Sequence, residues 1–192
     1  LNLKDWFEKR QKGESNRHAP YKQLFVTLNE NLTSETKNYL QVMLPNDFKD
    51  SIHHEVEFLT YRELMFDILD MSGKRNEFPP EKEMDFEAFN RIYSSTVLQK
   101  GLDAVLVWDE IRSVIKGTSE IGRKIIEKKQ YTSLNKERGQ TKVPDRFREK
   151  YYAEAERYQN YLEENEYWDS VDLARECYKI LDSGNHDFPL YD

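Results

Sequence analysis

Two short runs in the first third of the chain have the pattern of buried parallel strands. Residues 23–28 and 56–60 are mainly apolar and lack the strict alternation of a strand with one wet face. A threonine, Thr27 or Thr60, stands at the end of each run, and a helical pattern follows. Because α/β proteins bind ligands just beyond the carboxyl ends of parallel strands, these two strand ends form the first candidate site.

Helix-start signals follow both runs. Thr33 and Glu35 predict the N-cap and the first-turn acid of a helix that Pro45 ends. Thr60 and Glu63 have the spacing of a capping box, in which the hydroxyl accepts the third amide and the carboxylate reaches back. The expected inner face of the first of these helices consists of Leu32, Thr36, Tyr39, Leu40 and Met43.

The rest of the chain has mostly helical periodicity. We expect helices over residues 85–99, 103–116, 145–164 and 170–182, the last of them capped by Asp169. Their expected inward positions are Phe86, Phe89, Ile92 and Tyr93, then Val107, Trp108, Ile111, Val114 and Ile115, then Phe147, Tyr151, Ala155, Tyr158 and Leu162, and finally Val171, Ala174, Cys177 and Leu181.

These elements predict a mainly α fold with a few short parallel β-strands. Residues 1–12 have the pattern of the end of a helix, and residues 188–191 are apolar enough to begin a further strand. The strands are far apart in the sequence and helices separate them, which favours parallel pairing.

Composition limits the kinds of partner. The chain has 192 residues, a net charge of -7 and 13% aromatic residues, an aromatic content that argues against disorder. A protein that binds nucleic acid with its whole surface is normally basic, so any nucleic-acid contact here is local. The basic stretch 118–142 has two interpretations: it follows a nucleic-acid backbone, or it is a solvated loop.

Catalytic and metal chemistry find little support in the sequence. The single cysteine, Cys177, excludes an intramolecular disulfide and lies in a helical pattern without a nearby histidine, so we expect a small buried residue. His53 and His54 lack a carboxylate or thiol at ligand spacing, and we expect no metal site. Without a membrane span or a signal peptide, we expect a soluble intracellular protein, cytoplasmic or nucleoid-associated, with no membrane partner.

Five segments, in this order, carry a resemblance to superfamily 1 helicases of the UvrD/Rep type. Residues 24–32 (LFVTLNENL) resemble motif Ia, and residues 59–64 (LTYREL) resemble motif Ib. Residues 107–117 (VWDEIRSVIKG) are similar to a segment of the inserted helical subdomain of that family. Residues 158–173 resemble its following pair of helices, and residues 188–192 (FPLYD) resemble the strand that enters the Walker B acids.

The resemblance implies a partial RecA-like α/β lobe plus a helical insertion. Residues 1–70 would belong to the motor lobe with motifs Ia and Ib, residues 71–182 to an inserted 1B-like subdomain, and residues 183–192 to the start of the Walker B strand. The chain begins with Leu1 rather than Met, as an internal segment of a larger motor would. A Walker A loop upstream and acidic residues downstream are then expected in the parent protein.

The resemblance also implies a role for five residues at the two motifs. Thr27 and Asn29 would contact single-stranded nucleic acid at motif Ia, and Thr60, Tyr61 and Arg62 would do so at motif Ib. Hydroxyl and amide groups position a phosphate backbone without reading bases, and a tyrosine ring stacks on a base. Arg62 stands where the family often has histidine. Local structure offers other roles: an Asx-turn for Asn29, a plain cap for Thr60 and core packing for Tyr61.

Catalysis by the chain alone is not expected. The sequence has no Gly-x-x-x-x-Gly-Lys-(Ser/Thr), so it lacks the loop and the lysine that hold nucleotide phosphates. ATP and Mg²⁺ are expected for the full parent helicase, whose remaining chain would be a partner of this segment, and no cofactor is expected here. The alternative is a helical protein-interaction or scaffold module without motor function. Two copies pairing through exposed strand edges are a further expectation.

Overall fold

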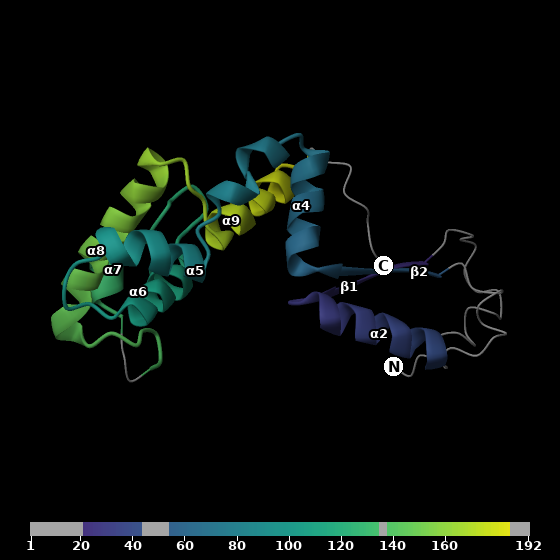
Figure 1. Ribbon diagram of the computed structural model, residues 1–192, viewed down its shortest axis with the longest axis horizontal. Helices are drawn as coiled ribbons and strands as arrows, with labels where there is room; N and C mark the ends of the chain where they lie inside the picture. The colour runs from purple at the N-terminus through teal and green to yellow at the C-terminus, as the bar shows by residue number, and fades with distance from the viewer. Residues whose placement is uncertain (1–20, 44–53, 135–137, 185–192) are drawn as a thin grey trace. The chain divides into compact units, whose positions relative to one another are not determined.

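The computed structural model describes residues 21–43, 54–134 and 138–184, which fall into two compact units (Figure 1). The first unit runs to Leu64 and the second begins at Met65. The helix end expected in residues 1–12 and the strand expected at 188–191 lie outside the described residues.

The first unit contains a two-stranded parallel sheet and one helix that packs along it. Strands β1 (Tyr21–Thr27) and β2 (His54–Thr60) pair in parallel along their whole length (Figure 1). Helix α2 (Glu30–Met43) follows β1 in the chain and contacts both strands. The rings of Phe25 and Phe58 are 5.5 Å apart across the two strands. The expectation of a mainly α chain with a few short parallel strands is confirmed.

Helix α2 begins earlier than the sequence predicted. Its cap is Asn29, whose Oδ1 accepts the amide of Leu32 at 2.8 Å, so the prediction of Thr33 as the N-cap is wrong. Thr33 lies inside the first turn and its hydroxyl donates to the carbonyl oxygen of Asn29 at 3.1 Å. Asparagine is among the residues most favoured at N-caps, and Asn29 precedes Thr33 in the chain, so the helix begins at the earlier residue.

The apolar face predicted for α2 is exposed rather than buried. Leu32, Tyr39 and Met43 are 48%, 65% and 60% exposed. The sheet is open as well, since Phe25 and Val26 are 39% and 38% exposed. Among the described side chains of this unit only the two threonines at the strand ends are buried. Parallel sheets are normally covered on both faces, whereas the described side chains of this sheet are largely exposed.

The second unit is helical. Its elements are residues 65–71 of α4 (Tyr61–Met71), then η1 (Arg75–Glu77), η2 (Pro80–Lys82), α5 (Phe86–Ala88), η3 (Phe89–Ser94), α6 (Ala104–Glu110), η4 (Ile111–Lys116), α7 (Lys128–Thr132), α8 (Asp145–Glu164) and α9 (Ser170–Asp182). The ranges predicted for α8 and α9 are confirmed. We call the large apolar cluster among α5–α8 the main core (Figure 1).

Two of the expected α-helices contain π-helical segments. Residues 89–94 form η3, and residues 111–116 form η4, which ends before Gly117. A π-turn shifts the facing of the residues that follow it. As a result Ile115 and Lys116, neighbours in the sequence, are both fully buried. A side chain at position 117 would place its Cβ 2.5 Å from the carbonyl oxygen of Arg112, so this position requires glycine.

The main core is rich in aromatic rings. Phe89 packs 5.3 Å from Tyr93, 5.0 Å from Trp108 and 5.7 Å from Tyr158, measured between ring centroids. All of these rings were predicted to face inward, and all are buried. Phe86 was also predicted inward but is 41% exposed, because it begins the three-residue helix α5 at the border of the core.

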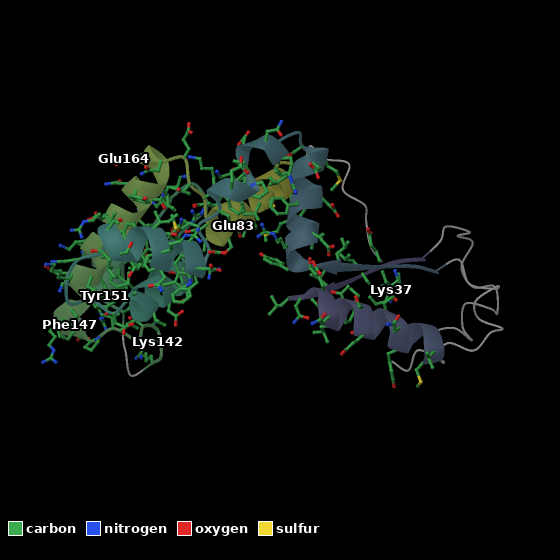
Figure 2. All side chains as sticks on the ribbon, in the orientation of Figure 1. Lys37, Glu83, Lys142, Phe147, Tyr151 and Glu164 are labelled. Atoms are coloured by element: carbon green, nitrogen blue, oxygen red, sulfur yellow. The ribbon has the colours of Figure 1, made fainter. Side chains whose placement is uncertain are left out.

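Two further expected inner faces needed correction. On α8, Phe147 lies in the first turn and is 41% exposed, whereas Tyr151 one turn later is buried (Figure 2). On α9, Leu181 was predicted to face inward but is 37% exposed, Val171 and Ala174 are only partly buried, and Cys177 is buried as predicted. The residues that α9 buries are Leu173, Cys177 and Ile180. The helix is rotated because its cysteine faces α4, where the thiol donates to the carbonyl oxygen of Met65 at 3.2 Å.

A search of the described helices finds none with the length and apolarity needed to cross a membrane.

Candidate functional site

The carboxyl ends of the two strands lie side by side and form the candidate site. Thr27 is the register partner of Thr60 in the parallel pair. Both threonines are buried, at 8% and 6% exposure; Thr60 immediately precedes α4, and Thr27 lies three residues before the first residue of α2. The parallel register therefore brings together two strand-to-helix junctions that are more than thirty residues apart in the sequence. We call this region the twin tips, defined by residues 27–33 and 60–63.

Hydrogen bonds within the first tip occupy its hydroxyl groups. The hydroxyl of Thr27 donates to the carbonyl oxygen of Asn29 at 2.9 Å and lies 2.5 Å from the hydroxyl of Thr33. The side chain of Asn29 caps α2 through the amide of Leu32. The local role weighed for Asn29 from the sequence was an Asx-turn, and its side chain instead serves as the helix cap. Leu28, between the threonine and the asparagine, is 88% exposed.

The second tip contains the capping box predicted from the sequence. The hydroxyl of Thr60 accepts the amide of Glu63 at 3.1 Å and donates to its Oε2 at 2.8 Å. The amide of Thr60 donates to the same oxygen at 2.7 Å. The backbone and hydroxyl hydrogen bonds from Thr60 lower the pKa of the Glu63 carboxyl, so a full negative charge lies at the start of α4 at neutral pH.

The groups that a ligand would meet at the twin tips are backbone amides and two exposed side chains. The first turns of α2 and α4 each begin with amides that have no acceptor inside a helix, and such amides favour phosphate. Tyr61 is 44% exposed and Arg62 is exposed as well, so the structure contradicts core packing for Tyr61. The twin tips combine amide donors, one cation and one aromatic ring, which suits an anion next to a planar base.

Glu63 limits the affinity of this arrangement. Its carboxylate already occupies the positive end of α4, where a phosphate would bind. Glu30 adds a second acid to the first turn of α2. Both acids oppose an approaching phosphate, and the capping-box pattern of Thr60 and Glu63 already contained the signal for this repulsion.

The twin tips do not fit a magnesium nucleotide. The hydroxyl groups here are bonded within the tips, and the oxygen of Glu63 that faces Thr60 already accepts two hydrogen bonds. Across residues 21–43, 54–134 and 138–184, no group of three or more His, Cys, Asp or Glu side chains could hold a metal ion. His53 lies outside the described residues.

The basic stretch 118–142 is folded where the structure describes it. Ile126, Tyr131 and Thr141 are buried, so the interpretation as a wholly solvated loop is wrong for these residues. Several of its cations are paired with acids: Arg123 with Glu127, Lys128 with Glu149 at 3.7 Å, and Lys142 with Asp109 at 3.1 Å. This pairing reduces the net field that the stretch presents to a polyanion.

Comparison with known proteins does not assign a family: no protein-family model, no curated protein and no solved structure matches the chain.

Proposed function

We propose that the twin tips hold single-stranded nucleic acid as part of a superfamily 1 helicase or translocase of the UvrD/Rep type. The observation that carries the proposal is the register pairing of Thr27 with Thr60, which aligns the ends of two parallel strands that both lead into helices. In a motor of this class the contacts with the strand arise from such loops. The order of the five sequence segments adds independent support.

The open sheet of the first unit also supports a role inside a larger protein. Apolar side chains of β1 and α2 are exposed, and a two-stranded sheet is marginal on its own. Further strands of a motor lobe would cover them. ATP and Mg²⁺ would bind in those other parts of the parent protein, since this chain has no phosphate-binding loop. Pairing of two copies through the strand edges stays a prediction, and sedimentation at several concentrations would test it.

A stacking contact from Tyr61 gives the first test. Fluorescence anisotropy with labelled oligo-dT and oligo-rU across a salt series should give binding that weakens steeply as salt rises. Tyr61→Ala should weaken it about 5- to 150-fold, because one base stack on an aromatic ring contributes about 1–3 kcal/mol. The control is Tyr39→Ala, which removes an exposed ring in the third turn of α2, away from the twin tips. Binding without salt dependence, or equal affinities for the two variants, would exclude the proposed contact.

Removal of the charge on Glu63 gives the second test, with the opposite sign. Glu63→Gln should strengthen oligonucleotide binding about 2- to 5-fold, because a charge at a helix end is worth about 0.3–1 kcal/mol. Glutamine also completes a capping box, so α4 keeps its start. Glu35→Gln, in the second turn of α2, removes the same charge away from the first turn and should change affinity less. A loss of affinity in Glu63→Gln would mean that nucleic acid does not approach the start of α4.

The second candidate function is a helical protein-interaction or scaffold module. The observation that favours it is the main core, which belongs to the helical unit alone and needs no contribution from the strand ends. This candidate predicts no salt-dependent binding of oligonucleotides and no effect of Tyr61→Ala or Glu63→Gln on it.

A further inference from the structure

The helical unit contains a second apolar cluster in addition to the main core. Within the described residues, no member of the main core comes from α4 or α9. The ring of Trp168 lies 6.2 Å from Phe66 and 5.5 Å from Phe78, and the thiol of Cys177 bonds the backbone of α4. Figure 1 shows α4 and α9 next to each other, with α5–α8 grouped separately. We call this group the α4–α9 cluster; its buried members are Met65, Phe66, Ile68, Leu69, Phe78, Trp168, Leu173, Cys177 and Ile180.

A buried charged group joins this cluster to the main core. The Nζ of Lys116, at the end of η4, lies 2.8 Å from Oδ2 of Asp169 and 2.8 Å from Oδ2 of Asp172. The side chains of Lys116 and Asp169 are fully buried. The hydroxyl of Tyr158, a main-core residue, donates to Asp169 at 3.2 Å. Ion pairs and hydrogen bonds therefore hold the start of α9 against the main core.

Two arginines extend this polar contact. Arg175 of α9 donates to the carbonyl oxygen of Lys116 at 3.0 Å and to the hydroxyl of Ser119 at 2.6 Å. Arg112 of η4 donates to the hydroxyl of Ser170. These bonds all run between α9 and the segment around η4. We call the whole contact, with Lys116, Asp169, Asp172, Arg112 and Arg175, the polar seam.

A short piece of backbone pairing adds a further link. The amide of Met84 donates to the carbonyl oxygen of Trp168 at 2.7 Å, and the amide of Trp168 donates to that of Lys82 at 3.0 Å. Glu83 lies between these two bonds (Figure 2). Buried ion pairs contribute little net stability because desolvation offsets their attraction. Structural units that meet through polar contacts, rather than through a large apolar interface, are expected to move relative to one another.

We propose that the polar seam is a hinge line along which the α4–α9 cluster opens from the main core as one cooperative unit. The ion pairs of Lys116 with Asp169 and Asp172 hold it closed. The apolar contacts of Trp168 and Cys177 hold the cluster together during opening. The core formed by α5–α8 stays closed, since its rings pack against one another. This hinge lies within the helical unit, and its opening does not depend on nucleic-acid binding.

Hydrogen exchange of the whole chain, measured by mass spectrometry at low denaturant concentrations, tests the hinge. Amides of α9 and of residues 65–71 should exchange together, at least about tenfold faster than amides of α8. Their opening should show a smaller denaturant dependence than global unfolding, because less surface is exposed. Exchange of α8 and α9 in one transition would overturn the proposal. So would exchange of α9 without residues 65–71.

Lys116→Met tests the role of this lysine directly. Removing the lysine leaves two carboxylates without their shared partner, so exchange in α9 and in residues 65–71 should accelerate by the same factor, about tenfold or more, and should keep its smaller denaturant dependence. The control is Lys128→Met, whose half-exposed ion pair with Glu149 should alter exchange less than about twofold. Acceleration of α9 without residues 65–71, or opening of α9 with the denaturant dependence of global unfolding, would contradict the hinge. If that variant does not fold, the wild-type exchange pattern alone decides.

Discussion

Phe89→Ala should lower the free energy of unfolding of the helical unit by about 3–5 kcal/mol, the usual cost of deleting a buried phenylalanine. Phe89 is fully buried, and its ring packs against those of Tyr93, Trp108 and Tyr158. The π-turn that begins at this residue leaves little freedom for the neighbouring rings to refill the space. Urea unfolding followed by far-UV circular dichroism measures the change.

Phe147→Ala is the matched control for this variant. The sequence periodicity assigns both phenylalanines to inner faces, but Phe147 is 41% exposed in the structure. We therefore expect a loss below about 1 kcal/mol, as for a surface substitution. Equal losses for the two variants would mean that Phe147 is buried in solution and that the described start of α8 is incorrect.

Asp169→Ala should cost the helical unit about 3–5 kcal/mol, as expected when one partner of a buried ion pair is removed. The carboxylate accepts the amides of Val171 and Asp172 as the cap of α9 and also bonds Lys116 and Tyr158. Asp169→Asn keeps a good N-cap but removes the charge, so it should recover about 1 kcal/mol of this loss. Urea unfolding at neutral pH separates the two contributions. If Asp169→Asn is as stable as the wild type, the charge of Asp169 does not contribute.

The same pair of acids predicts a particular pH dependence. Burial acts to raise the pKa of Asp169, but the charge and hydrogen bond of Lys116 and the cap amides outweigh it and lower the pKa. Its contribution to stability is therefore present above the unfolded value of about 3.9 and is lost as the pH falls through the lower, folded value. Burial and the neighbouring charge raise the pKa of Asp172. Its ionised form is disfavoured in the folded state, so that penalty is relieved as the pH falls toward about 3.9.

Unfolding curves between neutral pH and pH 3 measure both effects. In the wild type, this pair should not reduce stability until the pH falls below about 3.9, and the loss should then follow the titration of Asp169. Asp169→Asn should lack that acidic loss. If the difference in free energy of unfolding between the wild type and Asp169→Asn already disappears above pH 5, the pKa of the Asp169 carboxyl is not lowered.

Local sequence signals predicted well where a short stretch supplies both partners of an interaction. Thr60 and Glu63 form the predicted capping box, and Asp169 caps α9 with Asp172 completing its own box. The extent of α8 was also predictable, because a twenty-residue amphipathic pattern leaves few alternatives. At the start of α2, Asn29 and Thr33 were two adequate caps close together, and the pattern selected the wrong one.

Periodicity was less reliable for deciding which residues are buried. Tyr39 and Met43 have the spacing of an inner face but are exposed, because nothing in the described part of the first unit packs against that side of α2. On α9 the buried face includes Leu173 and Ile180 instead of Val171 and Leu181, since α4 and the polar seam fix the rotation of the helix. A helical pattern identifies apolar residues, but it does not identify the surface that meets them.

The sequence by itself determined the kinds of elements, their order and the local hydrogen bonds that start the helices, because these depend on residues within about one turn of each other. Only the tertiary structure decided that Thr27 is the register partner of Thr60, that Lys116 is buried between two acids, and that Trp168 packs against Phe66 and Phe78. Each of these contacts joins segments that lie dozens of residues apart in the sequence. Strand register or the extra residue of a π-turn brings them together. Such meetings follow from packing in three dimensions, which no local pattern encodes.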